Sequence, residues 1–472
     1  MKRFICLLIL FTSIHMIGQE ITSDNPLIND AFKLAVQTVD INIRRGILAA
    51  GGDYGGEWTR DISINSWNGV SLFRPKVAKE SLWSVTINKD TIGQQYWDKI
   101  IWSIAAWNHY LVTGDKEFLS QAFTCSANTM KKLEQITFDT NYCLFMGPSV
   151  FNDGIAAYPE PIYEPDNFSS GVLDHKNSYH IKCLSTNCVY YGAYIALSKM
   201  SIFLNKNSEI SKTYLQKAKD LKNSILKNFY NNNKNTFNYL IDQQRNVNDS
   251  QEALGISFAV IFGIIDGKKA DQLIENAVVS KYGITSITPD FPRYSKEMPG
   301  RHNNIIWPFV NGFFSKATVV TKNYNTFTHE LFSLTHLALD EDKGNYNFRE
   351  IYNPYSGKPD GGYQAWGKEH PNYHWESFKF QTWSATAYIS MVLNGLFGMK
   401  FSEESLSFEP FLPEEIGSIE LKDLKYRNSK LNILIKGKGN TIRSFTLDGK
   451  EQKKYSIVST IKGVHNLVIV LL

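Results

Sequence analysis

Two neighbouring stretches decide the fold: STNCVYYGAYIALSKMSIFL at residues 185–204 and EISKTYLQKAKDLKNSILKNF at residues 209–229. Apolar residues recur three to four positions apart in both stretches, which predicts two α-helices. Only the short polar segment 205–208 connects them. The pair is therefore predicted to form a helical hairpin.

The same alternation of amphipathic helices and polar, Gly- and Pro-rich loops extends over residues 27–400. It predicts about twelve helices, roughly thirty residues apart, which form either six hairpins closed into a ring, an (α/α)6 barrel, or an open solenoid. We favour the barrel because no fixed repeat is visible and because long loops carry clusters of Trp, Asp, Glu and Gly. The expected helices are 27–43, 61–73, 75–85, 96–112, 115–133, 185–204, 209–229, 251–264, 268–279, 305–321, 323–339 and 382–396.

The pattern changes after about Phe401, where short β-branched or alternating segments replace the helices. Asp448-Gly449 between two such segments is typical of a hairpin turn. We therefore expect a small β-sandwich-like module at residues 401–472 that packs against a barrel at residues 19–400.

The first eighteen residues have the pattern of a secretory signal peptide. A basic start, Met1-Lys2-Arg3, precedes the apolar run Phe4–Ile17, and the small Gly18 stands before Gln19. The run is too short for a spanning helix with stop-transfer flanks, and no later stretch has eighteen uninterrupted apolar residues. We expect an exported protein, periplasmic or secreted, without a membrane span.

Composition excludes some classes of protein. The 472 residues are 43% hydrophobic and 20% charged, which is incompatible with disorder of the whole chain. The formal charge of +4 argues against a nucleic-acid-binding protein. Removal of the signal peptide leaves Cys125, Cys143, Cys183 and Cys188; three disulfide pairings are open, although Cys125 and Cys188 lie in apolar helical patterns typical of buried free thiols. We expect no metal, no cofactor and a monomer.

Two glycine-containing clusters carry candidate functional residues. Gly51-Gly52-Asp53-Tyr54-Gly55-Gly56-Glu57-Trp58-Thr59-Arg60-Asp61 combines flexible backbone with an aromatic face and a carboxylate. Such a combination suits a pyranose, which has an apolar face and a rim of hydroxyls, whereas Asp61 alone could simply cap a helix. The loop Gly147-Pro148-Ser149-Val150-Phe151-Asn152-Asp153-Gly154 is by itself compatible with an ordinary turn.

Further candidates lie in the second half of the chain. Arg349-Glu350-Ile351-Tyr352-Asn353 places a carboxylate between aromatic residues, and Gln381-Thr382-Trp383-Ser384-Ala385 begins the last helix. Arg301-His302-Asn303-Asn304-Ile305-Ile306-Trp307-Pro308 precedes another helix. For Glu350 the alternative is a surface residue paired with Arg349.

Five motifs of this sequence occur in the order that is seen in six-hairpin glycosidases, which they resemble. They are Trp58–Asp61, Asn152–Gly154, Ile306–Pro308, Glu350–Asn353 and Gln381–Ala385. The chain is similar to the mannosylglycerate-hydrolase-like branch near glycoside hydrolase family 63, and more distantly to trehalases and the glucosidase domain of glycogen debranching enzymes. The resemblance covers roughly residues 27–410. It implies an inverting α-glycosidase on an (α/α)6 barrel, with a carbohydrate substrate.

The resemblance also implies roles for individual residues. Asp153 matches the general acid and Glu350 the general base, while Asn152 stands where relatives commonly place Trp or Met. Asp61 is therefore a second candidate for the acid and Glu376 a second candidate for the base. The expected substrate-binding residues are Trp58, Arg60, Asp61, Arg301, Trp307, Tyr352, Gln381 and Trp383.

Inversion requires one protonated carboxyl, one ionised carboxylate and space for a water between them, at roughly 6.5–9.5 Å. Asp153 should then have a raised pKa, through burial or through the charge of Glu350. Three alternatives remain open: a glycoside phosphorylase, in which phosphate replaces the water; a polysaccharide lyase; and a non-catalytic sugar-binding protein. The substrate class, an α-glucoside or α-mannoside, follows from the resemblance only.

Overall fold

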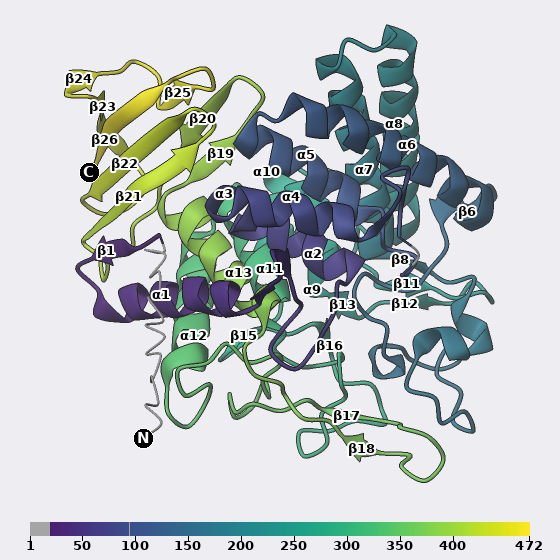
Figure 1. The fold of residues 1–472 in the computed structure, drawn as a ribbon. Coiled ribbons are helices and arrows are strands. Elements are labelled where there is room, and N and C mark those ends of the chain that lie inside the picture. The colour runs from purple at the N-terminus through teal and green to yellow at the C-terminus, as the bar shows by residue number, and fades with distance from the viewer. Residues whose placement is uncertain (1–18, 94) are drawn as a thin grey trace, which may run out of the picture.

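The computed structural model describes residues 19–93 and 95–472 (Figure 1). The predicted signal peptide, residues 1–18, lies outside the described residues. The main domain is rich in helices and the C-terminal part is a sheet, as predicted. The helices are α1 (Pro26–Ile41), α2 (Thr59–Asn65), η1 (Ser66–Val70), α3 (Ser71–Phe73), α4 (Pro75–Ser84), α5 (Ile101–Thr113), α6 (Lys116–Thr137), α7 (Leu184–Phe203), α8 (Ser208–Phe229), α9 (Ala253–Ile261), α10 (Gly267–Glu275), α11 (Pro308–Val320), α12 (Tyr324–Leu339), α13 (Thr382–Ser390) and η5 (Met391–Leu396).

Six of these helices contact one another in a circuit. α2 meets α5, followed by α7, α9, α11 and α13, and α13 meets α2 again. Helices α5, α7, α11 and α13 are buried almost all round, whereas α8 buries one stripe that includes Ala218, Leu221 and Ile225. Helices with one apolar stripe belong on the outside of such a circuit. Accordingly, α8 packs on α7 and α12 packs on α11.

The predicted helix over residues 61–73 is interrupted. It divides into α2, the π turn η1 and α3, and Gly69 within η1 has φ 146°. A Cβ at Gly69 would lie 2.6 Å from Ile389 Cγ2 on α13. The interruption thus coincides with a close approach of two inner helices, which only glycine permits at this φ.

Two other helices begin later than predicted. The helix expected from Tyr96 starts at Ile101, and the one expected from Ile305 starts at Pro308. Before α11 the backbone serves other partners: Ile305 O accepts from Ser286 N at 2.9 Å, and Ile306 pairs with Tyr352. Before α5, Tyr96 and Trp97 line a cavity. Sequence periodicity cannot distinguish such apolar residues from a first helical turn.

The C-terminal module contains two sheets. One has the order β1-β21-β22-β26-β23-β24 and the other β19-β20-β25. The predicted turn at Asp448-Gly449 connects β23 to β24. Sequence analysis missed β1, which pairs antiparallel with β21, and the parallel pairing of β22 with β26. The strands are β1 (Ile21–Ser23), β19 (Met399–Phe401), β20 (Ser405–Phe408), β21 (Ser418–Tyr426), β22 (Ser429–Lys436), β23 (Ile442–Leu447), β24 (Lys450–Glu451), β25 (Ser456–Val458) and β26 (Gly463–Leu471).

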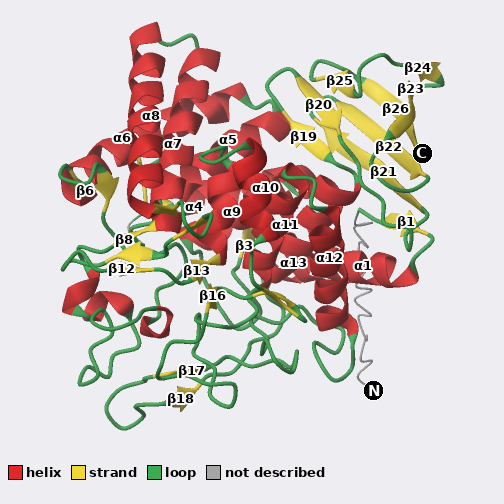
Figure 2. Ribbon diagram, turned by 180° about the vertical axis from the view of Figure 1, so that it is seen from behind, coloured by secondary structure: helices red, strands yellow, loops and turns green. Residues whose placement is uncertain are grey.

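The connections before α7, α9 and α11 contain β8 (Lys182–Cys183), β13 (Gln251–Glu252) and β16 (Ile287–Thr288), which lie among the green loops below the red helices (Figure 2). The short strands β17 (Tyr363–Gln364) and β18 (Tyr373–His374) form a hairpin on that side. The N-termini of the inner helices therefore face the long loops. Helix N-termini expose unpaired N–H groups and favour anionic side chains nearby.

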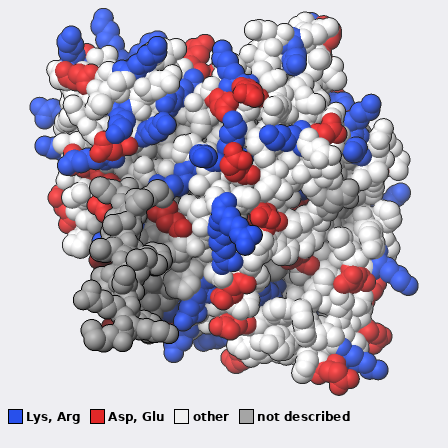
Figure 3. Space-filling view, in the orientation of Figure 1, with Lys and Arg blue, Asp and Glu red and all other residues white. Residues whose placement is uncertain are grey.

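The surface carries charges of both signs (Figure 3), and the cysteines form no disulfide among the described residues. On the face that Figure 3 shows, basic and acidic residues are interspersed over both domains. Within the described part of the chain, no helix is both long enough and apolar enough to cross a membrane. Cys125 and Cys188 are buried free thiols, as predicted, and Cys143 and Cys183 are free as well.

Candidate active site

A cavity of about 560 Å³ opens where the long loops meet the N-termini of α2, α11 and α13. Its walls combine carboxylates, two arginines and many aromatic rings. The lining residues are Ala50, Tyr54, Trp58, Arg60, Asp61, Tyr96, Trp97, Phe151, Asp153, Gly154, Ser170, Gly171, Val172, Leu173, Asp174, Arg301, His302, Trp307, Glu350, Gln364, Trp366, Trp375 and Trp383.

Arg60, in the first turn of α2, holds one group of carboxylates. Its Nη2 donates to Asp153 Oδ2 at 2.7 Å, while Asp61 Oδ2 and Asp98 Oδ2 lie 3.9 Å from Nε and 4.0 Å from Nη1. The Tyr96 ring packs on the guanidinium at 4.3 Å. One buried cation is thus shared by three carboxyl groups, and the group cannot hold three negative charges without a large electrostatic cost.

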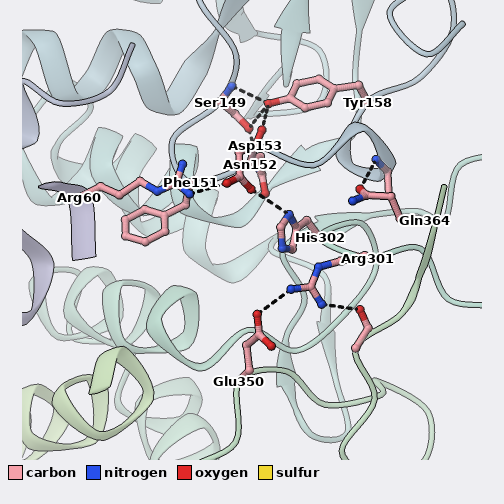
Figure 4. A network of polar contacts seen from close by, with 12 residues as sticks. Arg60, Ser149, Phe151, Asn152, Asp153, Tyr158, Arg301, His302, Glu350 and Gln364 are labelled. Atoms are coloured by element: carbon pink, nitrogen blue, oxygen red, sulfur yellow. Dashed lines mark hydrogen bonds and ion pairs between the residues drawn. The ribbon is translucent and has the colours of Figure 1, made fainter. Parts of the chain in front are cut away.

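The backbone of the Asp153 loop is fixed on both sides. Phe151 has φ 67°, and its N–H donates to the buried Asp98 Oδ2 at 2.9 Å. Asn152 is buried, and its Nδ2 donates to Ser149 Oγ at 2.6 Å. Its carbonyl accepts from the Tyr158 hydroxyl at 2.6 Å. These contacts hold the Asp153 carboxyl at the cavity wall, where 31% of its side chain is exposed (Figure 4).

Glu350 belongs to a second polar group. Its Oε1 accepts from Arg301 Nη2 at 2.7 Å and from the Tyr54 hydroxyl at 3.0 Å, and its side chain is 2% exposed. Arg301 also donates to the carbonyl of Gly361 at 3.1 Å. The Glu350 backbone N–H donates to the carbonyl of Phe378 at 2.9 Å. Charge, hydrogen bonds and backbone contacts therefore fix the orientation of this carboxylate.

His302 lies between the two groups (Figure 4). Its Nδ1 is 3.9 Å from Asp153 Oδ1, and its ring stacks on Trp307 with centroids 4.2 Å apart. Burial and the adjacent Arg301 lower the pKa of His302 to about 3. The imidazole is therefore neutral at neutral pH, and it adds no positive charge to the cavity.

The carboxyl groups around Arg60 have opposite pKa shifts. Burial, reinforced by the charges of Asp153 and Asp98, raises the pKa of Asp61 to about 7, although Arg60 opposes the shift. Burial also disfavours the ionised form of Asp153, but the charge and the hydrogen bond of Arg60 outweigh it and lower the pKa of that carboxyl. The expectation of a raised pKa at Asp153 is therefore wrong for the protein without substrate, because the sequence did not reveal the pairing of Asp153 with Arg60.

Comparison with known proteins shows similarity to two glycoside hydrolase families. Residues 156–375 match the model of the mannosylglycerate hydrolase MGH1-like glycoside hydrolase domain. This part of the chain is therefore similar to MGH1-like glycoside hydrolase domains. The match includes Arg301, Glu350 and Trp375, whereas Asp153 and α2 precede it. Residues 399–452 match the C-terminal domain of glycosyl hydrolase family 65. No curated protein matches the chain.

Several solved structures share the fold of this chain. A sialidase has a TM-score of 0.69 at 15% identity over 94% of this chain, and a GH78 family rhamnosidase of a Bacillus species has 0.61 at 12% over 89%. The chain spans only 40% and 42% of those two proteins. The GH63 mannosylglycerate hydrolase from Thermus thermophilus, in complex with glucose, has 0.59 at 13% identity, and the match covers 76% of this chain and 99% of that one.

The structure brings most of the predicted site residues together. Trp58, Arg60, Asp61, Asp153, Arg301, Trp307, Glu350 and Trp383 all line the cavity. Tyr352 and Gln381 do not line it. The Tyr352 hydroxyl accepts from Arg349 N and donates to the carbonyl of Asn347, and the Gln381 side chain packs against Gly51. Glu376, the second candidate for the base, is exposed and lies outside the cavity lining.

Several of the residues that line the cavity were not predicted. Tyr54 lies within the glycine cluster at residues 51–61. Its closeness in sequence to the predicted site residues Trp58 and Asp61 could have identified it. Asp98 lies between Trp97 and Lys99 in the sequence, with no signal that its carboxyl would support the Asp153 loop. Trp366 and Trp375 belong to a hairpin for which neither alternation nor turn residues gave a pattern.

Asp61→Asn should stabilise the protein, and more so at higher pH. Because the folded-state pKa of Asp61 is about 7, above its ordinary value of 3.8, stability falls as the pH rises between these values. Asn at this position carries no charge, so the substitution removes the free-energy cost of ionising residue 61 in the folded protein. We expect the gain in unfolding free energy to increase by on the order of 2 kcal/mol from pH 5 to pH 8, with one pKa unit equal to about 1.36 kcal/mol.

Thermal unfolding of both proteins at pH 5 and pH 8 measures this effect. Asp53→Asn, which changes an exposed carboxylate in the preceding loop, is the control and should show no such pH-dependent gain. A Tm gain for Asp61→Asn that is equal or smaller at pH 8 would contradict the raised pKa.

Proposed function

We propose that the protein is an exported, inverting glycoside hydrolase that acts on an α-linked glycoside of the α-glucoside or α-mannoside type. One observation carries the proposal: Asp153 and Glu350 belong to one cavity but to two separate polar groups, each with its own arginine (Figure 4). Inversion needs one carboxyl group as the acid and another as the base. Different surroundings within one site can give the two groups the different pKa values that these roles require. The circuit of helix contacts supports an (α/α)6 barrel as the scaffold.

Glu350 is proposed as the general base. Its Oε1 is occupied by Arg301 and Tyr54, while Oε2 receives only a 3.4 Å contact from the Phe378 N–H. Oε2 is therefore the atom with capacity to accept a proton from an attacking water. The fixed orientation of the carboxylate would position that water against the anomeric carbon, and such positioning contributes much of the rate.

Asp153 is proposed as the general acid that protonates the leaving oxygen. Paired with Arg60 it is ionised before substrate arrives, so it must gain a proton when substrate binds. A sugar that displaces water from the exposed part of its side chain would raise its pKa by desolvation. Asp61 is the second candidate for this role because its pKa of about 7 suits a group that holds a proton near neutral pH.

Hydrolysis of α-D-glucosyl fluoride and α-D-mannosyl fluoride tests the proposal and identifies the glycone. We expect turnover of one of them, and of an α-linked disaccharide with the same glycone, without added phosphate. Turnover that depends on inorganic phosphate and yields a sugar phosphate would instead identify a phosphorylase. Sugar binding without turnover of any substrate would identify a non-catalytic binding protein.

A further inference from the structure

The outer end of the cavity is walled by the β17–β18 hairpin. Trp366, in the connection between the strands, lines both the main cavity and an adjoining groove formed with Phe168, Ser169, Ser170 and Gly367. The backbone at this position is fixed, because the backbone N–H of Trp366 donates to the carbonyl of His370 and that of Gly367 donates to the carbonyl of Phe168, both at 2.9 Å. Trp366 is nevertheless 56% exposed.

A second tryptophan connects this surface to the proposed base. Trp375 meets Trp366 edge to face, with ring centroids 4.8 Å apart at an interplanar angle of 81°. On its other side, the Arg301 guanidinium lies 4.9 Å from the centre of the Trp375 ring. Arg301 in turn binds Glu350. The aromatic surface is thus continuous with the catalytic group, at the side of the cavity that opens to solvent.

The charges of the cavity restrict what this surface can bind. Asp61, Asp153, Asp174 and Glu350 line the cavity together with only two arginines. Both arginines are already paired, Arg60 with Asp153 and Arg301 with Glu350, each at 2.7 Å. Among the described residues that line the cavity, no unpaired cation is left for an anionic ligand. Asp174, which is exposed beside Leu173 at the rim, would repel one.

We propose that Trp366 and Trp375 form a subsite for the leaving group, and that this subsite takes a neutral pyranose rather than an aglycone that carries a carboxylate. An exposed indole ring beside a polar rim suits the apolar face and the hydroxyl edge of a sugar. An organic-acid aglycone would need an unpaired cation at the same place. The inference rests on the proposed function, because it requires Asp153 and Glu350 to cleave between a glycone at the inner end of the cavity and a leaving group at Trp366 and Trp375.

Binding to the Glu350→Gln protein tests the subsite without turnover. The probes are the tightest-binding member of a panel of α-linked glucose and mannose disaccharides, the methyl α-glycoside of its non-reducing sugar, and the same sugar linked to glycerate. We expect the disaccharide to bind at least about 10-fold more tightly than the glycerate compound. Adding Trp366→Ala should weaken disaccharide binding about 5- to 10-fold and binding of the methyl glycoside much less.

Tyr179→Ala is the matched control, because Tyr179 has the same 56% exposure and does not line the cavity. Trp366→Phe, which keeps a smaller ring, should recover part of the affinity. Equal or tighter binding of the glycerate compound, or an unchanged dissociation constant in Trp366→Ala, would overturn the subsite. A disaccharide that binds through Trp366 but is not hydrolysed by the wild-type protein would refute the proposed hydrolysis and leave the subsite standing.

Discussion

Replacing Glu350 by Gln should lower kcat at least about 100-fold, the low end of what general acid–base catalysis contributes. The amide has the shape of the carboxylate and can still accept hydrogen bonds from Arg301 and Tyr54, but it cannot take a proton from water. Sugar binding should therefore remain nearly intact. Steady-state kinetics on a disaccharide substrate, together with calorimetric binding of the same sugar to the inactive variant, separate the two effects.

Glu376→Gln is the control for this prediction, since it makes the same chemical change at an exposed carboxylate just before Phe378. It should behave like the wild-type protein. If Glu350→Gln kept wild-type activity and Glu376→Gln lost it, the base would be Glu376, and the glycosidase assignment would still stand.

Asp153→Asn should be comparably damaging with a poor leaving group and much milder with a good one. A disaccharide requires protonation of its leaving oxygen, so we expect a loss of at least about 100-fold in kcat. The phenolate of an activated aryl glycoside can leave without being protonated. We therefore expect kcat for this substrate to fall by no more than about 10-fold. Parallel kinetics on the two substrates measure the difference.

Asp61→Asn provides the comparison for this selectivity. As a group proposed to contact sugar hydroxyls, Asp61 should affect both substrates alike and weaken binding together with rate. Equal losses on both substrates in Asp153→Asn, with selectivity appearing in Asp61→Asn instead, would exchange the two roles and make Asp61 the acid.

The fold was largely predictable because its signals are local. Apolar periodicity predicted the helices from α1 to α13 within a few residues, and alternation with Asp448-Gly449 predicted much of the C-terminal sheets. The exceptions are non-local. β1 is a strand because β21 offers it an edge, and Ile305 and Ile306 leave the helix because Ser286 and Tyr352 bind their backbone.

The site was predictable to the extent that its motifs begin helices. Trp58, Asp61, Trp307 and Trp383 lie at the starts of α2, α11 and α13, so a circuit of inner helices brings them to one cavity. Protonation was not predictable, because the pKa of Asp153 depends on Arg60, which is distant in sequence. The same holds for Asp98 and for the Trp366–Trp375 surface, whose positions depend on contacts between loops.

The anomeric configuration of the first product tests the central claim most directly. In an inverting enzyme the water activated by Glu350 attacks the face opposite the leaving group, so an α-linked substrate must yield the β-anomer first. Proton NMR during the first minutes, before mutarotation, distinguishes the two anomers. The β-anomer as first product is the predicted result. The α-anomer would mean retention through an enzyme nucleophile and would contradict Glu350 as a water-activating base.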